Sequence, residues 1–339
     1  MDDSLRYGIV GCAGIGNTHA EAIADVEDAD LVACADVNED AAREFVAEHA
    51  PDAETHAEAG EMVRESDVEA VSVCTPSGTH ADVACEAAEA GAHVLCEKPL
   101  DVYRDRIDRM IDTCKREGVT LAGVYQKRFE PHARRAKRAI EEGELGDPVS
   151  ASLTVDWFRS QPYYDSGEWR GTRSMDGGVL LNQAIHAIDR LQWLLGGVES
   201  VSAMTDTLAR EMESEDTAAI AVRFESGALG TIQATTATKG GSRRTEVNAT
   251  EGTLEIEGGE LSIEVGTGEE SYYGAETESL EVEGVAHDCG AGHVGVVRDF
   301  VEAIRTGREP EVPAREARVA VDTILAAYDS SETGERIEL

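Results

Sequence analysis

The sequence predicts an α/β protein in two parts: a doubly wound parallel sheet at the N-terminus, then an α/β domain with an open, mostly antiparallel sheet. Two observations lead to this prediction. Short apolar runs alternate with helix-like segments over the first 125 residues, whereas neighbouring strand-and-turn patterns dominate from Val198 to about Glu283. The length of 339 residues suffices for two ordinary domains, which we place at 1–125 and 126–339.

The first domain alternates strands and helices. Its apolar runs have the length of buried strands, and the segments between them are rich in Ala and Glu with helical spacing. This alternation implies right-handed crossovers and a parallel sheet covered on both faces. The expected strands are Leu5–Val10, Leu31–Asp36, Ala70–Thr75, His93–Cys96 and Val119–Val124, and the expected helices include Asp40–His49, Thr79–Ala90 and Arg104–Glu117.

The second domain begins with a helix and then changes to strands. A strong helix is expected over Asp176–Leu195. It should end there because Gly196-Gly197 follows. The succession of neighbouring strands after it favours antiparallel pairing. The other expected elements are the helix Pro131–Glu142, the strands Val149–Asp156, Thr217–Phe224, Ala228–Ala237 and the run Thr245–Glu257, and two closing helices, His293–Thr306 and Ala314–Tyr328, which can pack back on the first domain.

The composition is strongly acidic. The formal net charge is −38, from 68 acidic and 30 basic residues, and only five of the basic residues are Lys. This pattern suggests a halophilic protein, because high salt screens the self-repulsion of so many like charges; a merely acidic protein is the alternative. No basic stripe offsets the acidic field, so nucleic acid is not an expected partner.

Neither a membrane segment nor a secretory leader is expected. No stretch approaches the roughly 18 apolar residues of a membrane helix, and the start, MDDSLRYGIVG, has no basic or apolar leader region. The expected location is therefore the cytoplasm. The seven cysteines include no Cys-x-x-Cys, so we expect small buried thiols without disulfides or a zinc site.

A glycine-rich turn separates the first strand from the first helix. Glycines at this point allow a tight turn and let backbone N–H groups approach a pyrophosphate. Asp36 ends the second strand, where a carboxylate can accept both ribose hydroxyls of NAD and repel a 2′-phosphate. We therefore expect a Rossmann domain that binds NAD rather than NADP, with helix capping by Asp36 as the alternative. The cofactor residues expected here are Gly11, Ala13, Gly14, Ile15, Gly16 and Asp36.

The fifth strand ends in Cys96-Glu97-Lys98-Pro99. Because the carboxyl ends of strands face the ligand crevice of a doubly wound sheet, Lys98 is expected at the cofactor; a turn lysine paired with Glu97 is the alternative. A cis peptide before Pro99 would suit this turn. The fourth strand ends on the same edge. Cofactor contacts are therefore expected from Thr75, Pro76, His80, Glu97 and Lys98.

Three polar residues share one face of the helix expected over Asp176–Leu195. Asn182, His186 and Asp189 have the spacing i, i+4 and i+7 beside an apolar stripe. Histidine is a natural general base near neutral pH, and Asp189 could orient it. A polar trio of this kind suggests the wall of a site, whereas an isolated histidine would more commonly be a structural core residue.

Aromatic residues gather just before this helix. They make up 5% of the chain, yet five fall within the 13 residues Trp157–Trp169. Aromatic faces with interleaved polar groups suit a sugar ring; packing between domains is the alternative. The expected substrate-binding residues are Lys98, Tyr125, Arg128, Trp157, Tyr163, Tyr164, Asn182 and His186, and Trp169 and Arg170 are expected to reach the cofactor or substrate.

Taken together, these motifs resemble the Gfo/Idh/MocA oxidoreductase family. The resemblance rests on Gly11-x-x-Gly14-x-Gly16, Thr75-Pro76, Glu97-Lys98-Pro99 and the helix with Asn182 and His186, in the same order along nearly the whole chain. It implies a second domain with a large open sheet that pairs subunits into a homodimer or homotetramer. It also implies an NAD(P)-dependent dehydrogenase or reductase acting on CH–OH groups of sugars, sugar nucleotides or cyclitols.

The resemblance further implies catalytic roles for Lys98, His186 and Asn182. His186 would take the hydroxyl proton, and Lys98 would hydrogen-bond the same oxygen. Many members of the family have Asp where this chain has Asn182. Because Asn cannot relay a proton, a positioning hydrogen bond is expected there.

Two other functions stay open on the same fold. One is a hydrolase that uses NAD transiently to cleave a glycosidic bond and therefore forms no net NADH. The other is a non-catalytic NAD-sensing regulator, against which the joint presence of Lys98 and His186 argues. No metal ion is expected.

Overall fold

A computed structural model describes residues 4–271 and 274–339. The chain forms two compact units, and both are discontinuous in sequence. Unit 1 consists of Met1–Gln126 and Asp288–Arg318, and unit 2 of Lys127–His287 and Val319–Leu339. The sequence analysis instead expected two continuous segments that meet after residue 125.

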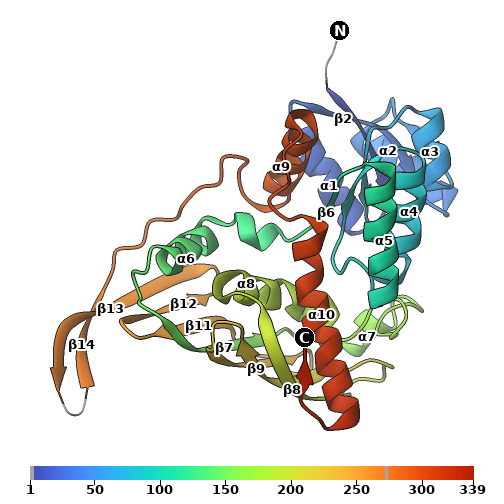
Figure 1. Cartoon of the computed structure of the whole chain (residues 1–339). Coiled ribbons are helices and arrows are strands. Elements are labelled where there is room, and N and C mark those ends of the chain that lie inside the picture. The colour runs from blue at the N-terminus through green and yellow to red at the C-terminus, as the bar shows by residue number, and fades with distance from the viewer. Residues whose placement is uncertain (1–3, 272–273) are drawn as a thin grey trace. The chain divides into compact units, whose positions relative to one another are not determined.

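Unit 1 contains a six-stranded parallel sheet in the order β3-β2-β1-β4-β5-β6. Figure 1 labels β2 and β6 of this sheet. The order reverses between β1 and β4, which is where a doubly wound sheet opens a ligand crevice at the carboxyl ends of its strands. The predicted doubly wound fold is confirmed. The strands are β1 Leu5–Val10, β2 Ala29–Ala35, β3 Glu54–His56, β4 Ala70–Val73, β5 His93–Cys96 and β6 Leu121–Gly123.

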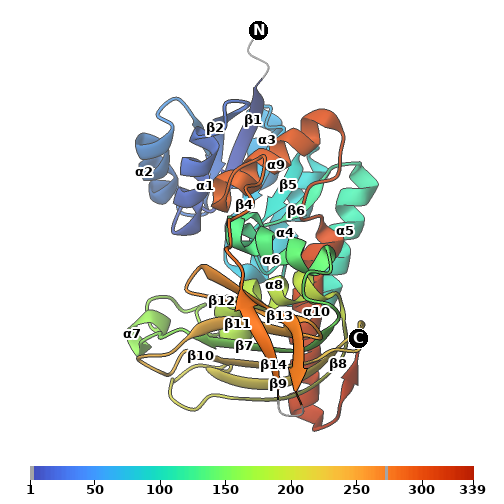
Figure 2. The ribbon, with the colours of Figure 1, turned by 90° about the vertical axis from the view of Figure 1, so that its left-hand side faces the viewer.

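Helices cover both faces of this sheet because its central strands are mostly apolar and buried. Ile9, Val71 and Leu95 are fully buried, as expected for central parallel strands. Helix α9 packs against α1, as Figure 2 also shows, so a late segment of the chain completes the unit. The helices are α1 Ile15–Ala24, α2 Glu39–His49, α3 Ala59–Glu65, α4 His80–Glu89, α5 Arg104–Glu117 and α9 Gly292–Thr306.

Unit 2 contains a nine-stranded sheet in the order β14-β13-β12-β11-β7-β10-β9-β8-β15. Its neighbours pair antiparallel except β7 and β10, which are parallel. The prediction of an open, mostly antiparallel sheet is confirmed. The strands are β7 Pro148–Asp156, β8 Val198–Asp206, β9 Thr217–Phe224, β10 Leu229–Thr235, β11 Arg243–Ala249, β12 Gly252–Glu257, β13 Glu260–Ser271, β14 Gly274–Ser279 and β15 Ile337–Glu338.

The helices of unit 2 are α6 Pro131–Glu141, the short α7 Gln161–Tyr164, α8 Ile185–Leu195 and most of α10 Ala314–Thr333. Both α6 and α8 pack on one face of the sheet (Figure 1). The inward residues of the central strands are apolar and buried, for example Leu153, Ile220 and Ile232. Among the described residues, none of the helices combines the length and apolar character needed to cross a membrane.

The opposite face of the four central strands is almost free of charge. Strand register places alternate residues of β7, β10, β9 and β8 on this face, and Met204 is 77% exposed there. The middle of the face carries only small or uncharged side chains, namely Ser152, Thr154, Thr231, Gln233, Ala219, Ala221, Ser202 and Met204.

Candidate active site

The glycine turn after β1 requires glycine at three positions. Gly11 has a φ of 99°, and a Cβ atom there would lie 2.6 Å from the carbonyl oxygen of Cys74. A Cβ atom on Gly16 would lie 2.2 Å from the carbonyl oxygen of Gly11. Gly14 has a φ of 52° and faces open space. No side chain therefore covers the backbone at Gly14, the N-cap residue of helix α1.

The first turn of α1 is suited to an anion. It contains no acidic residue, and its N-cap, Gly14, provides no side-chain cap. Helix α2, by contrast, is capped by the Asn38 side chain and begins with two acidic residues. Backbone N–H groups and the helix dipole at an uncapped terminus favour phosphate. The turn thus fits the pyrophosphate of a dinucleotide.

Asp36, the residue after β2, lies beside the glycine turn. Its Oδ2 accepts a hydrogen bond from the backbone N–H of Cys12 (2.9 Å), and its Oδ1 accepts one from Asn38 N–H (2.8 Å). Asn38, and not Asp36, caps α2, so the capping alternative for Asp36 is wrong. The next residue, Val37, is 94% exposed.

The turns after β4 and β5 are joined by His80. Its Nδ1 lies 2.7 Å from the carbonyl oxygen of Pro99, and its Nε2 lies 2.8 Å from that of Thr75. Burial lowers the pKa of His80, although both carbonyls act in the opposite direction. His80 is 1% exposed. Through its two ring nitrogens it connects the turn after β4 to the turn after β5. The Lys98–Pro99 peptide is cis, as predicted.

A buried polar chain holds Glu97. The Tyr7 hydroxyl lies 3.0 Å from Ser72 Oγ, which lies 2.8 Å from His19 Nδ1; His19 Nε2 lies 3.1 Å from Glu97 Oε1. His293, from α9, lies 3.7 Å from the same oxygen.

The other oxygen of Glu97 is also engaged, since its Oε2 accepts the backbone N–H of Lys98 at 3.1 Å. Burial raises the pKa of Glu97, but the contacts with His19 and His293 outweigh it and hold the pKa well below its usual range. A charged Glu97 therefore fixes the backbone of Lys98.

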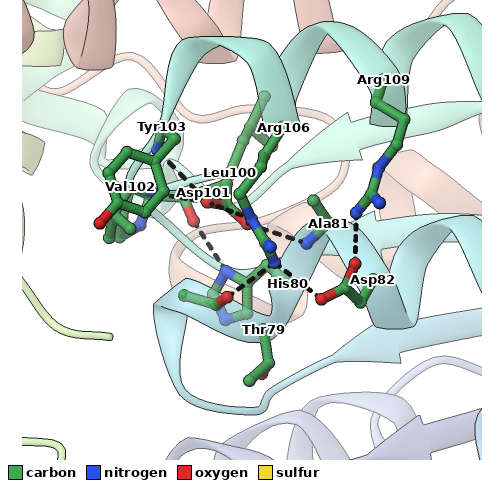
Figure 3. Close-up of polar contacts among 12 residues, drawn as sticks. Thr79, His80, Ala81, Asp82, Leu100, Asp101, Val102, Tyr103, Arg106 and Arg109 are labelled. Atoms are coloured by element: carbon green, nitrogen blue, oxygen red, sulfur yellow. Dashed lines mark hydrogen bonds and ion pairs between the residues drawn. The ribbon is translucent and has the colours of Figure 1, made fainter. Parts of the chain in front are cut away.

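Asp101 completes this turn. It accepts hydrogen bonds from the backbone of Val102 (2.7 Å) and from Nε of Arg106, which also pairs with Asp82 (Figure 3). Asp101 is fully buried, so the arginine compensates a charge that would otherwise be costly to bury. Helices α4 and α5 are thereby tied to the segment that carries Lys98.

The helix with Asn182 and His186 starts later than predicted and with a π-helical turn, Leu180–Ala184. The Asn182 side-chain amide donates to Asp176, and Gln183 donates to the Asn182 side-chain oxygen at 2.9 Å. Asp176 also accepts the backbone N–H of Gly171 (2.8 Å). Asn182 is thus anchored to the loop before it.

Glu215 fixes the start of this helix, and the sequence analysis missed it. Its Oε1 accepts Leu180 N–H at 2.9 Å and the Tyr328 hydroxyl at 3.0 Å. Gly178 leaves room for it, because a Cβ atom there would lie 2.1 Å from Glu215 Oε2. Burial raises the pKa of Glu215 to about 7. The paired Gly177-Gly178 indicates that another group approaches the backbone closely here. The sequence could not identify that group, because Glu215 lies 37 residues after Gly178.

Asp189 pairs with Arg128 inside unit 2. Arg128 Nε and Nη2 donate to the two carboxylate oxygens at 3.0 and 2.6 Å, and both residues are nearly fully buried. Asp189 therefore balances the charge of an arginine that the sequence analysis expected at the substrate. Tyr125, another expected substrate residue, is 1% exposed and donates to the Ala317 carbonyl.

The aromatic segment lies between the end of β7 and the Asn182 helix. Trp157 and Tyr163 are half-buried and contact arginine guanidinium groups. Arg170 contacts the rings of both Tyr163 and Trp169 at 4.5 Å. Tyr164 instead is buried and donates to Thr236 Oγ1 at 2.9 Å. The structure thus brings Trp157, Tyr163, Trp169 and Arg170 together within unit 2, and places Tyr164 in its core.

Two family profiles match the chain. Residues 5–125 match an oxidoreductase family with an NAD-binding Rossmann fold, and residues 133–255 match the GFO/IDH/MocA C-terminal domain. The WlbA dehydrogenase from Bordetella pertussis, solved with NADH and UDP-GlcNAcA, is 33% identical, with a TM-score of 0.87 and 99% of both chains covered.

Two curated relatives extend over the full chain. Myo-inositol 2-dehydrogenase of Thermotoga maritima is 28% identical, over 99% of this chain and 98% of the relative. D-xylose 1-dehydrogenase (NADP(+)) 2 of Haloferax volcanii is 29% identical, over 99% and 100%.

The fold, the glycine turn and these similarities define a Rossmann-fold, NAD(P)-dependent oxidoreductase that acts on CH–OH groups. More particularly, the chain belongs to the Gfo/Idh/MocA oxidoreductase family. The resemblance stated from the sequence is therefore confirmed.

Proposed function

We propose that the protein transfers hydride between NAD and a secondary alcohol of a sugar, sugar nucleotide or cyclitol. The names of the relatives support this range, since they include an inositol dehydrogenase, a xylose dehydrogenase and a dehydrogenase solved with a sugar nucleotide. The observation that carries the proposal is the turn after β5. Buried polar groups of His80, Glu97 and Asp101 fix its backbone on the cofactor edge of the sheet, and Lys98 is the residue that it presents.

The proposed chemistry divides between three residues. His186 accepts the proton of the substrate hydroxyl, and Lys98 hydrogen-bonds the same oxygen and stabilises its developing negative charge. Asn182, held by Asp176, positions the substrate without relaying a proton. Bound NAD would supply the hydride acceptor. The expected cofactor contacts of Thr75, Pro76 and Ile15, and the substrate contacts of Tyr163, stay predictions.

We also propose a preference for NAD over NADP. The Asp36 carboxylate is held beside the glycine turn by Cys12 N–H and Asn38 N–H. Each of its oxygens retains capacity for a ribose hydroxyl, whereas a 2′-phosphate would meet a like charge.

The uncharged middle of the face formed by β7, β10, β9 and β8, which carries charge only at its ends, supports a homodimer or homotetramer. In a chain of net charge −38, two copies would repel one another through most surfaces. A flat face of small uncharged residues around exposed Met204 avoids this repulsion. We propose it as the subunit interface.

A substrate panel tests the proposed function. The purified protein is incubated with NAD in molar KCl and with aldoses, inositols and sugar nucleotides, and NADH is followed by its absorbance. At least one class should give NADH in proportion to substrate consumed. A panel in which a glycosidic bond is cleaved without net NADH, or in which nothing reacts, would contradict the proposal.

A further inference from the structure

Four basic side chains of unit 2 gather around one aromatic segment without a carboxylate partner. Many arginines pair with carboxylates, as Arg135 does with Glu144 and Arg315 with Glu309. Among the residues that the structure describes, Arg159, Arg170, Lys239 and Arg243 form no ion pair. Since acidic residues outnumber basic ones by more than two to one, cations without an acidic partner need an explanation.

Aromatic rings hold the three arginines in one cluster. The guanidinium carbons of Arg243 and Arg159 lie 4.6 and 5.2 Å from the ring centre of Trp157. Arg159 and Arg170 share Tyr163 in the same way, at 4.8 and 4.5 Å. Cation–π contacts orient these groups but leave their positive charges uncompensated. The positive charges of the three arginines therefore repel one another, and a bound anion would reduce this repulsion.

The cluster borders a cavity of about 420 Å³. Lys239 and Arg243 line it together with Trp157, Phe158 and Asp156. Two buried atoms have no hydrogen-bond partner among the described residues: Oδ1 of Asp156, an acceptor that lines the cavity, and Nε of Arg159, a donor whose guanidinium lies over the cavity residue Trp157. A buried group without a partner is unfavourable. The pair therefore points to a ligand that brings both an acceptor and a donor.

Neighbouring acids form no ion pair with the cluster, and this includes Asp156, which lines the same cavity and accepts the backbone N–H of Ser242. Asp165 and Glu168 lie on the same loop but are exposed and form no ion pair with its arginines. Arg210, which contacts Phe158, donates to the carbonyls of Arg159 and Thr236 and so holds the loop in place.

The cluster is also linked to the proposed catalytic helix within unit 2. Arg170 is followed by Gly171, whose N–H is bound by Asp176, and Asp176 binds the side chain of Asn182. A ligand group held by the cluster would therefore be positioned through the same loop that positions Asn182.

We propose that Arg159, Arg170, Lys239 and Arg243 form a subsite for the anionic group of an acidic carbohydrate. This deepens the proposed function and rests on it. The anion is a carboxylate or a phosphate. The planar guanidinium groups can donate two parallel hydrogen bonds to either of these groups. A hydroxyl of the same ligand donates to Asp156 Oδ1. The substrate class is thus a uronate, a sugar phosphate or a sugar nucleotide, and not a neutral sugar or cyclitol.

Titration calorimetry on NADH-loaded protein tests the subsite without turnover. The probes are glucuronate, glucose 6-phosphate, UDP and glucose, in the lowest KCl concentration that keeps the protein folded. NADH prevents the probes from occupying the dinucleotide site. At least one anionic probe should bind and glucose should bind much more weakly. Binding of glucuronate alone would identify a carboxylate site, and binding of UDP or the phosphate a phosphate site.

Variants assign the binding to the cluster. Arg243→Gln and Arg159→Gln should each raise the dissociation constant of the bound anion about tenfold or more, as expected for a charged hydrogen bond. Arg223→Gln is the matched control, because Arg223 lies in unit 2 at the opposite end of β9 from this cavity. Its dissociation constant should match that of the wild type.

Three results would overturn the subsite: no anionic probe binds, glucose binds as well as the anions, or Arg223→Gln weakens binding as much as Arg243→Gln. Failure of the proposed function has a different signature, since the protein would then form no NADH with any carbohydrate while anion binding could persist.

Discussion

A single carboxylate, Asp36, joins the glycine turn to the end of β2. The sequence predicted Asp36 as the last residue of the second strand, and it is the residue after β2, which ends at Ala35. Its hydrogen bond to Cys12 N–H was not predictable, since it depends on how the turn folds back toward β2. This contact holds the carboxylate beside the glycine turn.

Asp36→Ser should shift the cofactor preference toward NADP. The substitution removes the negative charge that would face a 2′-phosphate while leaving a hydroxyl for hydrogen bonding. We expect the ratio of kcat/KM for NAD to that for NADP to fall by about tenfold or more.

Asp40→Ser is the control for this change, because Asp40 is an exposed acid on α2. An unchanged ratio in Asp36→Ser, or an equal change in both variants, would show that cofactor selection lies elsewhere.

The helix that carries Asn182 and His186 depends on a buried glutamate at its start. Glu215 accepts Leu180 N–H and the Tyr328 hydroxyl, and burial raises its pKa from 4.5 to about 7. The folded protein therefore holds a proton here that the unfolded chain releases above about pH 4.5. The stability contributed by this group is complete below that pH and is lost as the pH rises through about 7.

Glu215→Gln should remove this pH dependence. Glutamine keeps the acceptor for Leu180 N–H but stays neutral, so the variant should gain stability relative to the wild type between pH 5 and 8, by at most about 3 kcal/mol. Urea unfolding at the two pH values measures the gain. Glu213→Gln, an exposed neighbour, should show no such change. An identical response of the wild type and Glu215→Gln to pH would show that Glu215 does not titrate differently in the folded and unfolded states.

Local patterns predicted most elements, and long-range packing decided the rest. The Arg104–Glu117 helix was predicted with its observed bounds because it has strong amphipathic spacing and ends at Gly118. The helix expected from Asp176 begins at Leu180 instead, because Gly177 has a φ of 76° and Glu215 meets the chain at Leu180. The short β3 and α3 have too few residues to show a period.

The same division applies to the candidate site. Lys98 and Asn182 lie in recognisable local motifs, whereas their supports come from distant segments. His19 and His293 reach Glu97 from α1 and α9, and no local pattern in either helix predicts that contact. Arg128 was predicted at the substrate because its partner, Asp189, lies 61 residues away. Sequence patterns thus located the groups proposed for the chemistry better than the groups that hold them.

Across the entire chain, the excess of acidic residues should make stability depend on salt. At a net charge of −38 the folded state repels itself, and the Debye length falls from about 10 Å at 0.1 M salt to about 3 Å at 1 M. We expect the Tm to rise by more than about 5 °C between about 0.1 and 1 M KCl. Sucrose, which strengthens burial without screening charge, serves as the control. A Tm that is flat or falls with KCl would refute the halophilic interpretation.

The proposed subunit interface predicts a defined oligomer. Met204→Asp would place a charge in the middle of the uncharged sheet face and should convert the wild-type oligomer to monomers. A stable interface buries about 800 Å² per partner, so a central charge is difficult to accommodate. Light scattering after size exclusion measures the mass. Leu208→Asp, at a position 67% exposed, should leave it unchanged. A monomeric wild type, or an intact oligomer in Met204→Asp, would contradict the interface.

The joint action of Lys98 and His186 on one hydroxyl is the central claim. The decisive measurement is kcat for NADH formation, with a substrate from the panel, in Lys98→Ala and His186→Ala, together with the NAD dissociation constant of each variant. We predict that each substitution lowers kcat by at least about 100-fold, the usual contribution of a general acid or base, while NAD still binds. Turnover near the wild-type rate in either variant would contradict the account.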